Sequence, residues 1–473
     1  MNNLPPSPPR LPIIGNLHQL GPIPHRSLKS LADKYGGVML LQLGSKPTLV
    51  ISSANTAEEI RKRDLDFADR IPLIVAGRLS YNFKDMALSP YGEYWRQLRF
   101  LCVSQLLSNK RVQSFRSIRE AEIATMLGNI RESCVSCSVI CISDMLATLN
   151  NNIVSLGTIG RRYSEEKKGS QFMALFHECS ILCACVNIAD FIPWLGWINH
   201  INGMESKVAR LVKVVDQYLE SILQEGLQRR KVVNTEQQGH QNLLDVLLNL
   251  QHENTSGSIL DRDSIKAVIL NMIVGGTDTT YALLDWALSE LLKNPSAMTR
   301  LQNEVRQFSG FKSDGIITED DLGKFPYLKA VIKETLRLHP PASILVRKSS
   351  QAVKFLGYDI EQGTQVYINT WAIGRDPQHW ENADEFQPER FLNSNVDFKG
   401  QHAEFLPFGV GRRSCPGSAF GLVIAELALA NLVCHFNFSL PNGKRSEELD
   451  MTDAYGLVTV RKNPLLLVAS VPS

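Results

Sequence analysis

The chain has 473 residues, of which 44% are hydrophobic and 21% are charged, and this composition excludes disordered and collagen-like proteins. Its formal net charge of +2 provides no strong positive field of the kind that nucleic-acid-binding proteins carry, so we expect no nucleic-acid partner. The nine cysteines are odd in number and show no repeated spacing, which argues against a disulfide framework and favours a reducing compartment.

The chain begins with a proline-rich segment. Residues 1–10 read Met-Asn-Asn-Leu-Pro-Pro-Ser-Pro-Pro-Arg, and a proline run acts as a semi-rigid spacer between two bodies. We expect either a disordered tail or a spacer that follows a segment absent from this chain. No window contains 18 uninterrupted apolar residues, so the sequence predicts no membrane-spanning helix.

Two short strands come next, and helices then dominate. Residues 38–43 and 47–53 are rich in apolar residues and flank a Gly-Ser-Lys turn, which predicts a hairpin. From about residue 56 the helical period prevails, and residues 207–230 show it most clearly, with apolar residues at spacings of three and four. Residues 231–258 predict a helix that is flanked by solvated loops.

A long apolar helix is predicted at residues 263–292, although Gly275-Gly-Thr-Asp-Thr-Thr280 lies in its middle. A glycine inside a helix costs about 1 kcal/mol relative to alanine, and Thr and Asp side chains compete for backbone hydrogen bonds. Either a loop separates two shorter helices here, or one locally opened helix passes close to a flat object that side chains would obstruct.

Further helices are predicted from Pro295, from Pro326 to about His339, and at residues 419–436, with strands at 353–360 and 365–369. Length alone suggests about three domains at roughly 150 residues each. Because no internal repeat and no central linker divides the chain, we expect one large, mostly helical domain with small sheets at its edge.

The residues with the clearest chemical meaning form a glycine-rich loop at 408–417, Phe-Gly-Val-Gly-Arg-Arg-Ser-Cys-Pro-Gly, which leads into a helix. Gly417 permits a close approach of backbone to a ligand. Amide groups at the helix start can donate to the Cys415 thiolate. Arg413 can pair with a carboxylate of a cofactor, and Phe408 can shield the sulfur from water. The alternative is a structural cysteine in a capping loop.

This loop resembles the signature FxxGxRxCxG of the cytochrome P-450 family of haem-thiolate monooxygenases, which it matches at Phe408, Gly411, Arg413, Cys415 and Gly417. The resemblance implies that Cys415 is the axial ligand of the iron of haem b. A thiolate ligand pushes electron density towards O–O cleavage. In this setting Phe408, Arg413 and Gly417 belong to the cofactor site.

Two further motifs fit the same family. Glu334-Thr-Leu-Arg337 resembles its ExxR pair, and Pro388-Glu-Arg-Phe391 resembles its PERF element. Glu334 and Arg337 are three residues apart, so they lie on one helical face and can pair. The resemblance implies that Arg390 joins them in a buried network behind the haem loop.

The glycine-interrupted helix resembles the family motif [AG]GxDT[ST]. The resemblance implies one helix whose glycines pass over the haem, with Asp278 and Thr279 relaying protons to the oxygen that the haem activates. The alternative for Thr279 is a residue that only kinks the helix. Trp95-Arg-Gln-Leu-Arg99 resembles the family's WxxxR, in which both side chains reach a haem propionate, and the spacing of four places them on one face.

The segment after His339-Pro-Pro departs from the pattern. Plant members usually continue to a Pro-Arg whose arginine binds the other propionate, whereas this chain has Ala-Ser-Ile-Leu-Val-Arg347-Lys348 and lacks that proline. A planar guanidinium suits a carboxylate better than an ammonium group does. We therefore assign the role to Arg347, with Lys348 as the second choice.

The resemblance covers almost the whole chain and implies a cytochrome P-450 fold, mainly α with small β-sheets (α+β), in a single large domain that encloses the haem. Residues 1–12 are then a hinge after a membrane anchor that this chain lacks, and residues 13–473 are the catalytic domain. It further implies a monomer on the cytoplasmic face of the endoplasmic reticulum membrane, similar to plant enzymes of specialised metabolism.

The implied reaction inserts one oxygen atom from O₂ into a small lipophilic metabolite, such as a terpenoid, phenylpropanoid or indole derivative, with electrons from NADPH through a flavin reductase. A mostly apolar substrate pocket is expected from residues 71–88, 269–279, 342–346 and 455–458. A basic face that docks an acidic reductase is expected from Arg96, Lys110, Arg111 and Arg412, with an ordinary solvated face as the alternative.

Two other functions stay open at this point. An enzyme of the same fold can use its haem for dehydration, isomerisation or oxidative coupling, and the intact Asp278-Thr279 pair argues against the members that dispense with O₂. A haem or ligand-binding protein without turnover is the second, and it predicts stoichiometric binding without NADPH consumption.

Overall fold

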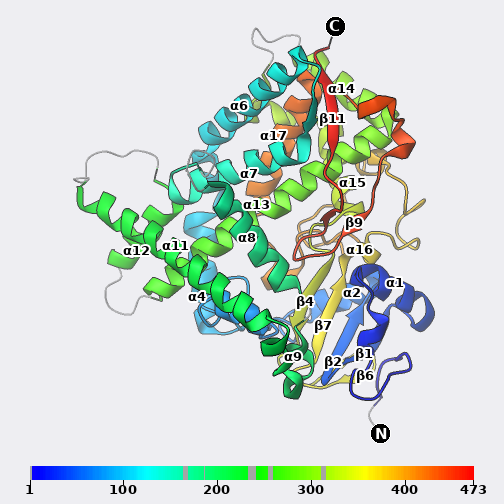
Figure 1. Cartoon of the computed structure of the whole chain (residues 1–473). Coiled ribbons are helices and arrows are strands. Elements are labelled where there is room, and N and C mark those ends of the chain that lie inside the picture. The colour runs from blue at the N-terminus through cyan, green and yellow to red at the C-terminus, as the bar shows by residue number, and fades with distance from the viewer. Residues whose placement is uncertain are drawn as a thin grey trace.

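The computed structural model describes residues 3–162, 169–185, 187–232, 241–253, 259–309 and 316–472. Helices form most of the molecule, and a small sheet lies at the edge that carries the N-terminus (Figure 1). This confirms the predicted mainly helical fold with small sheets.

The largest sheet brings together strands from both ends of the chain. Its order is β1 (Val38–Leu43), β2 (Lys46–Ile51), β7 (Gln365–Asn369) and β4 (Ile344–Lys348). β1 and β2 form the predicted antiparallel hairpin, β7 runs parallel to β2, and β4 runs antiparallel to β7. β4 was not predicted from the sequence, and it is the segment that carries Arg347.

Three smaller sheets complete the β-structure. β11 lies between β3 and β8, while β5 pairs with β6 and β9 with β10, all antiparallel. Their bounds are β3 Val139–Cys141, β5 Val353–Phe355, β6 Tyr358–Ile360, β8 Asn437–Ser439, β9 Asp453–Ala454, β10 Val460–Arg461 and β11 Leu466–Ser470.

α13 (Arg262–Lys293) is one continuous helix of 32 residues, so the alternative of a loop between two shorter helices is wrong. The Asp261 side chain caps its first turn by accepting from the Ser264 amide. The hydroxyl of Thr279 donates to the Gly275 carbonyl of the same helix at 2.7 Å. Helix-internal bonds of this kind, together with burial, outweigh the low helix propensity of the motif.

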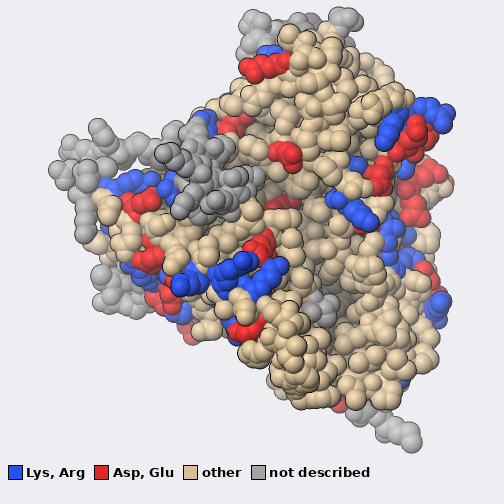
Figure 2. Space-filling view, in the orientation of Figure 1, with Lys and Arg blue, Asp and Glu red and all other residues tan. Residues whose placement is uncertain are grey.

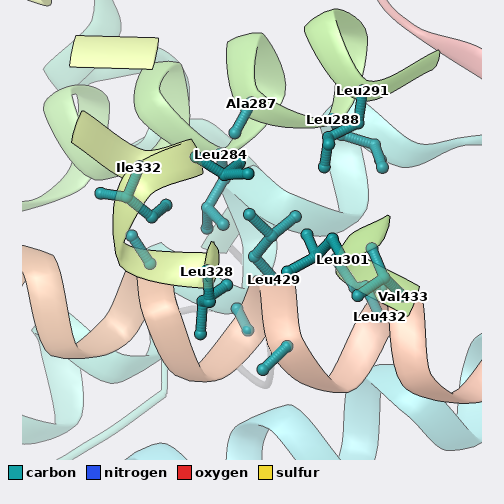
Figure 3. Close-up of a cluster of buried hydrophobic side chains, with 14 of the residues drawn as sticks. Leu284, Ala287, Leu288, Leu291, Leu301, Leu328, Ile332, Leu429, Leu432 and Val433 are labelled. Carbon is teal, nitrogen blue, oxygen red and sulfur yellow. The ribbon is translucent and has the colours of Figure 1, made fainter. Parts of the chain in front are cut away.

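The main hydrophobic core surrounds α13. Leu284, Leu288 and Leu291 of α13 meet Leu429 and Leu432 of α17 (Ser418–His435) in the close-up of Figure 3. All five are fully or almost fully buried, and α14 (Pro295–Ser309), α15 (Pro326–Leu338) and α7 (Ile142–Ile159) close the cluster. Burial of this kind stabilises by roughly 1.5–3 kcal/mol per leucine, and it holds α13 and α17 rigidly beside each other.

The remaining helices surround this centre. Among them, α11 and α12 confirm the two helices predicted at 207–230 and within 231–258. The predicted flanking loops at 233–240 and 254–258 lie outside the described residues. Their bounds are α1 Pro24–Tyr35, α2 Ala54–Lys62, α3 Ile74–Leu79, α4 Glu93–Leu101, α5 Asn109–Ser114, α6 Arg116–Val135, α8 Gly169–Ala184, α9 Ile188–Phe191, α10 Ile198–Ile201, α11 Met204–Val232, α12 Leu243–Glu253 and α16 Thr370–Ile373.

The described part of the proline segment is bonded to the sheets. The Pro6 carbonyl accepts from the Leu40 amide of β1 at 2.8 Å, and the Asn3 carbonyl accepts from the Asp359 amide of β6 at 2.7 Å. Residues 3–12 therefore do not form a free tail in this structure.

Among the residues that the structure describes, three stretches are long and apolar enough to cross a membrane by length and composition, namely Ala174–Phe191, Arg262–Lys293 and Ser418–His435. The second and third are α13 and α17, which pack against each other in the core. Their apolar composition is therefore explained by burial inside the protein.

Candidate active site

The Cys415 loop is shaped by a left-handed turn and by one backbone hydrogen bond. Gly411 has φ +64°, and a Cβ added there would lie 1.9 Å from Asp64 Oδ1, so only glycine fits. The Cys415 amide donates to the Phe408 carbonyl at 2.8 Å, which closes the loop just before α17 begins. The motif residues therefore form one compact turn.

The sulfur of Cys415 lies in an interior position that stays accessible. Burial raises the pKa of its thiol, whereas the amides of Gly417 and Ser418 and the charge of Arg99 lower it. The residue nevertheless keeps a large accessible surface. Amide donors at a helix start stabilise the thiolate form of a cysteine.

Open space also lies beside Gly275 of α13. Gly275 is exposed in the middle of a buried helix, and a Cβ added there would meet no atom within 4 Å. α13 and α17 meet nearby, because a Cβ on Gly421 would lie 3.1 Å from Thr280 Oγ1. The sequence motif on α13 and the cysteine loop are thus held on neighbouring parts of one core.

Arg413 carries a buried hydrogen-bond donor that is not satisfied. Its Nε donates to the Ala68 carbonyl at 2.8 Å and one Nη to the Ser89 carbonyl at 2.6 Å. Its other Nη is buried without a partner among the described residues. Its guanidinium stacks on the ring of Trp95 at 4.0 Å. A buried cation with an unused donor points to an anionic ligand.

Three more guanidinium groups share this region. Arg347 Nη1 donates to Asp64 Oδ1 at 3.0 Å, and Arg99 Nη2 donates to the Ser414 carbonyl at 2.8 Å, next to the cysteine. Arg70 Nε donates to the Ala87 carbonyl at 2.9 Å, and another of its nitrogens donates to the Val346 carbonyl.

The four guanidinium groups repel one another in a poorly hydrated place. Burial, with the charges of Arg347 and Arg99 added, lowers the pKa of Arg70 to about 10. Burial and the charge of Arg70 lower the pKa of Arg413 to about 9. Shifts of this direction mean that the cluster has too little negative charge around it.

The residues present therefore fit the haem that the sequence implied. The cluster is suited to two carboxylates, which are the propionates of a haem. A cysteine with amide donors lies beside it, and open space adjoins Gly275 of α13. A flat dianionic cofactor that takes a thiolate ligand matches all three features.

The structure distinguishes between Arg347 and Lys348. Successive residues of β4 point to opposite faces. Arg347 is 1% exposed and lies in the guanidinium cluster. The Lys348 ammonium instead pairs with Asp69 at 2.8 Å and its side chain is 27% exposed. Arg347 is thus the residue that the geometry favours.

Trp95 has a different geometry from the one expected. Its indole N–H donates to the Met86 carbonyl at 3.0 Å rather than being left free for a carboxylate. Its ring lies under the guanidinium of Arg413 and within 5.7 Å of that of Arg99. In this structure Trp95 orients the two arginines through cation–π contacts.

Asp278 and Thr279 lie on the same part of α13 and have different partners. Asp278 accepts a hydrogen bond from the Ser180 hydroxyl of α8 at 2.7 Å, while Thr279 donates to its own helix. Burial raises the pKa of Asp278, and the Ser180 bond and the charge of His177 oppose that change. A carboxyl with a raised pKa is suited to holding and releasing protons.

Glu334, Arg337 and Arg390 form the expected buried network. Arg337 donates to both carboxylate oxygens of Glu334, at 2.7 and 2.8 Å, and Arg390 Nε donates to Glu334 Oε1 at 2.9 Å. Arg337 also donates to the Gly374 carbonyl at 2.6 Å. The network joins α15 to the 3-10 turn Pro388–Phe391 and to the loop after α16.

Several residues of the site carried no signal in the sequence. Arg70, Asp64 and Ser180 belong to none of the motifs, and Ser180 is 98 residues from its partner Asp278. Contacts of this kind arise through space, so neither spacing nor periodicity could identify them. A buried arginine would mark Arg70 as unusual, because arginine is rarely buried without a partner. Burial, however, cannot be read from a single sequence.

A separate surface hollow of about 610 Å³ lies elsewhere. None of its lining residues belongs to the Cys415 loop, so it is not the cofactor site; they are Asn109, Val112, Gln113, Arg116, Glu319, Asp320 and Val423.

Comparisons with known proteins identify the family and the fold of the chain. The family model for cytochrome P450 matches residues 5–468. The chain is 51% identical to a tabersonine/lochnericine 19-hydroxylase of Catharanthus roseus, and the match covers 99% of this chain and 93% of that protein. It is 48% identical to a (+)-menthofuran synthase of Mentha piperita, and the match covers 98% of this chain and 93% of that protein. A zebra fish cytochrome P450 solved with progesterone has the same fold, with a TM-score of 0.80 and 24% sequence identity. The superposition covers 95% of this chain and 99% of that one.

We predict that the Glu334 network contributes strongly to stability. In Glu334→Gln, Arg337 and Arg390 lose the carboxylate to which both donate. The free energy of unfolding should therefore fall by about 3–5 kcal/mol. Glu389→Gln is the matched control, because the Glu389 side chain is 50% exposed in its pair with Arg300. Thermal and urea unfolding measure both variants. Equal loss in the two variants would contradict the prediction, and Arg390→Lys provides a milder variant if Glu334→Gln does not fold.

Proposed function

The chain belongs to the cytochrome P450 family and is a haem b monooxygenase, and from this premise we propose that it oxygenates a small lipophilic plant metabolite with NADPH-derived electrons. The observation that supports the site assignment is the buried guanidinium cluster beside an accessible cysteine. Net dehydration, isomerisation or oxidative coupling has no specific observation in its favour.

In the proposed mechanism the chain holds the cofactor and controls access to it. When bound, the haem supplies the redox chemistry that transfers one atom of O₂ to the substrate and the other to water. Cys415 would hold the iron through Sγ, and Phe408 and Gly417 would shape the loop around that sulfur. Arg99, Arg347 and Arg413 would pair with the propionates, with Arg70 as a further donor.

Two residues of α13 are proposed to move protons. Asp278 would hold a proton on its carboxyl group, which burial favours. Thr279 Oγ1 now donates to the Gly275 carbonyl. By turning, it would accept the proton of Asp278 while it releases its own proton into the open space beside Gly275, so the hydroxyl itself is unchanged. Asp278 would then recover a proton from solvent, so the pair acts repeatedly without net change.

The proposed substrate class rests on the relatives and on the apolar surroundings of α13. Ile269 and Ile273 of α13 pack with Val75 and Leu79 of α3 in one buried cluster. A psoralen synthase of Ammi majus is also 47% identical to this chain, so relatives with comparable identity are named for an alkaloid, a terpenoid and a furanocoumarin reaction. An apolar pocket orients such ligands mainly by shape.

The proposed reductase contact is the face of α4 above the cysteine loop. Arg96 and Phe100 are exposed and lie four residues apart on α4, with Phe100 75% exposed. Arg99 of the same helix reaches the Ser414 carbonyl next to Cys415. Lys110 and Arg412 are also exposed, while Arg111 is half-buried and donates to the Gln105 and Gln241 carbonyls. An exposed aromatic among cations suits an acidic partner.

A membrane contact is proposed at the edge near α9, in keeping with a location on the cytoplasmic face of the endoplasmic reticulum membrane. Trp194, Trp197 and Ile201 are each more than half exposed, and so is Ile13. Residues near α9 join the N-terminal sheet, because the Phe191 carbonyl accepts from the Ser45 amide at 2.7 Å. Figure 2 shows few charged side chains over this edge. Exposed tryptophans are typical of membrane interfaces. We propose a monomer, with residues 1–12 as the hinge and residues 13–473 as the catalytic domain.

The proposed function is tested with the holoenzyme, a plant NADPH-dependent flavin reductase and a panel of alkaloids, terpenoids and coumarins. We expect a substrate-induced spectral shift with at least one class, followed by a product that carries one ¹⁸O atom from ¹⁸O₂. Cys415→Ser should lose the thiolate spectral signature and the product. Product formation without NADPH would favour the isomerase or dehydratase function, and binding without NADPH consumption would favour a ligand-binding protein.

The assignment of Arg347 over Lys348 predicts an asymmetric effect on haem binding. Arg347→Met should weaken haem affinity about 10- to 100-fold, because a charge-assisted hydrogen bond is lost. Lys348→Met should change it by less than about twofold, because the Lys348 ammonium lies on the other face of β4 and pairs with Asp69. Transfer of haem to a competing haem-binding protein measures both. The reverse order would show that Lys348 is the propionate ligand.

The docking face predicts a salt-dependent rate of reduction. Combining Arg96→Glu with Lys110→Glu should slow reduction by the reductase about tenfold at low ionic strength and flatten its salt dependence. Lys354→Glu is the control, because Lys354 is an exposed lysine on β5. Stopped-flow reduction kinetics provide the measurement, and an unchanged salt dependence in the double variant would exclude this face.

A further inference from the structure

A serine outside every recognised motif holds the carboxylate of Asp278. Ser180 Oγ donates to Asp278 Oδ2 at 2.7 Å, and Ser180 is 5% exposed. The bond joins two helices, because Ser180 is on α8 and Asp278 is on α13. A buried hydrogen bond to a charged acceptor is stronger than one between neutral groups. The position of this carboxylate therefore depends on a second helix.

α8 is connected to the helices that lie over α13. Its Glu178 carboxylate lies 3.6 Å from the Lys207 ammonium and 3.5 Å from the Arg210 guanidinium, both on α11. Arg78 of α3 pairs with Glu205 of α11 at 2.6 Å. Figure 1 shows α8 beside α13 and α11. α3, α8 and α11 thus form one connected layer, and Ser180 is a polar contact between this layer and α13.

The same layer holds the apolar side chains next to α13. Cys179 and Leu182 of α8 pack in one buried cluster with Val75 of α3 and with Ile269 and Ile273 of α13. A ligand placed against α13 in this cluster would touch α8. Any displacement of α8 would then also change the distance between the Ser180 hydroxyl and the Asp278 carboxylate.

The titratable groups that face Asp278 are few. On α8, His177 lowers the pKa of Asp278, and Asp278 in turn is one of the charges that raise the pKa of Cys179. Burial is the largest influence on Asp278, and the Ser180 hydroxyl is the largest influence that opposes it. A donor to the ionised form lowers the pKa of an acid, so loss of that donor raises it.

We propose that Ser180 is the positioning residue of the proton relay, and that it makes proton delivery by Asp278 depend on where α8 lies. This rests on the proposed function, in which Asp278 donates protons. A proton leaves Asp278, the resulting carboxylate stays bonded to the Ser180 hydroxyl, and solvent returns a proton to it. Ser180 gains and loses nothing in the cycle. Its part is to keep the carboxylate in one rotamer and to favour its ionised form.

The test compares Ser180→Ala with Ser180→Thr in the holoenzyme. Infrared titration of the protonated Asp278 carboxyl, identified by its loss in Asp278→Asn, gives a readout that is independent of turnover. In Ser180→Ala the titration midpoint should move to higher pH, because the ionised form has lost its donor. Product formed per NADPH should fall about 2- to 10-fold, the range expected for one buried hydrogen bond. Ser180→Thr, which keeps the hydroxyl, should restore both.

Ser289→Ala is the matched control. Ser289 is a fully buried serine of α13 whose hydroxyl donates to the Asp285 carbonyl of its own helix at 2.6 Å. This variant should leave the infrared midpoint and the product per NADPH unchanged. If Ser180→Ala behaves like Ser289→Ala in both readouts, the role of Ser180 is overturned.

Failure of the proposed function gives a different pattern. If Asp278→Asn leaves the product per NADPH unchanged, the proton role of Asp278 is wrong, whatever Ser180 does. If Asp278→Asn lowers it and Ser180→Ala does not, only the role of Ser180 is wrong. Adding Ser180→Ala to Asp278→Asn should cause no further loss, because the hydroxyl then has no carboxylate to position. Equal losses from Ser180→Ala in both backgrounds would show a merely structural role and overturn the proposal.

Discussion

Four guanidinium groups are gathered on one side of the Cys415 loop, and the rest of the structure is arranged so that the chain tolerates them. Arg70 and Arg413 have lowered pKa values because they are buried and because they repel their neighbours. Asp64, Asp69 and Asp85 are described acids that act on members of the group. An uncompensated buried charge is expensive, so an anionic ligand beside this cluster would stabilise it.

The elements that bring these charges together come from distant parts of the chain. β4 contributes Arg347, α4 contributes Arg99, and the turn before α17 contributes Arg413. Each needs a rigid support. β4 is held by β7 in the mixed sheet, α17 by the leucine core around α13, and α15 by the Glu334 network. Function in this protein therefore depends on parts of the fold that never contact a ligand.

The two sides of the site are held by different kinds of contact. The cysteine side combines a closed loop, a buried ion network and a leucine core. On the opposite side, α8 and α11 are joined by Glu178 and its two cationic partners at 3.5–3.6 Å, and by a shared buried apolar cluster that includes Leu182 and Leu211. Surface ion pairs contribute little stability, so the apolar cluster provides most of the stabilisation on that side.

The sequence by itself determined the family, the fold class, the cysteine loop and the pairing of Glu334 with Arg337, because these depend on short spacings within one element or one turn. It also predicted the long helix, whose continuity stayed open until tertiary packing was known. The sequence already favoured Arg347 over Lys348 on the chemistry of the guanidinium group, and the tertiary structure added the physical reason, since strand β4 sends their side chains to opposite faces. The tertiary structure alone brought Arg70 to the charge cluster and Ser180 to Asp278. These contacts join residues that are far apart in the chain, and local pattern carries no information about such distances.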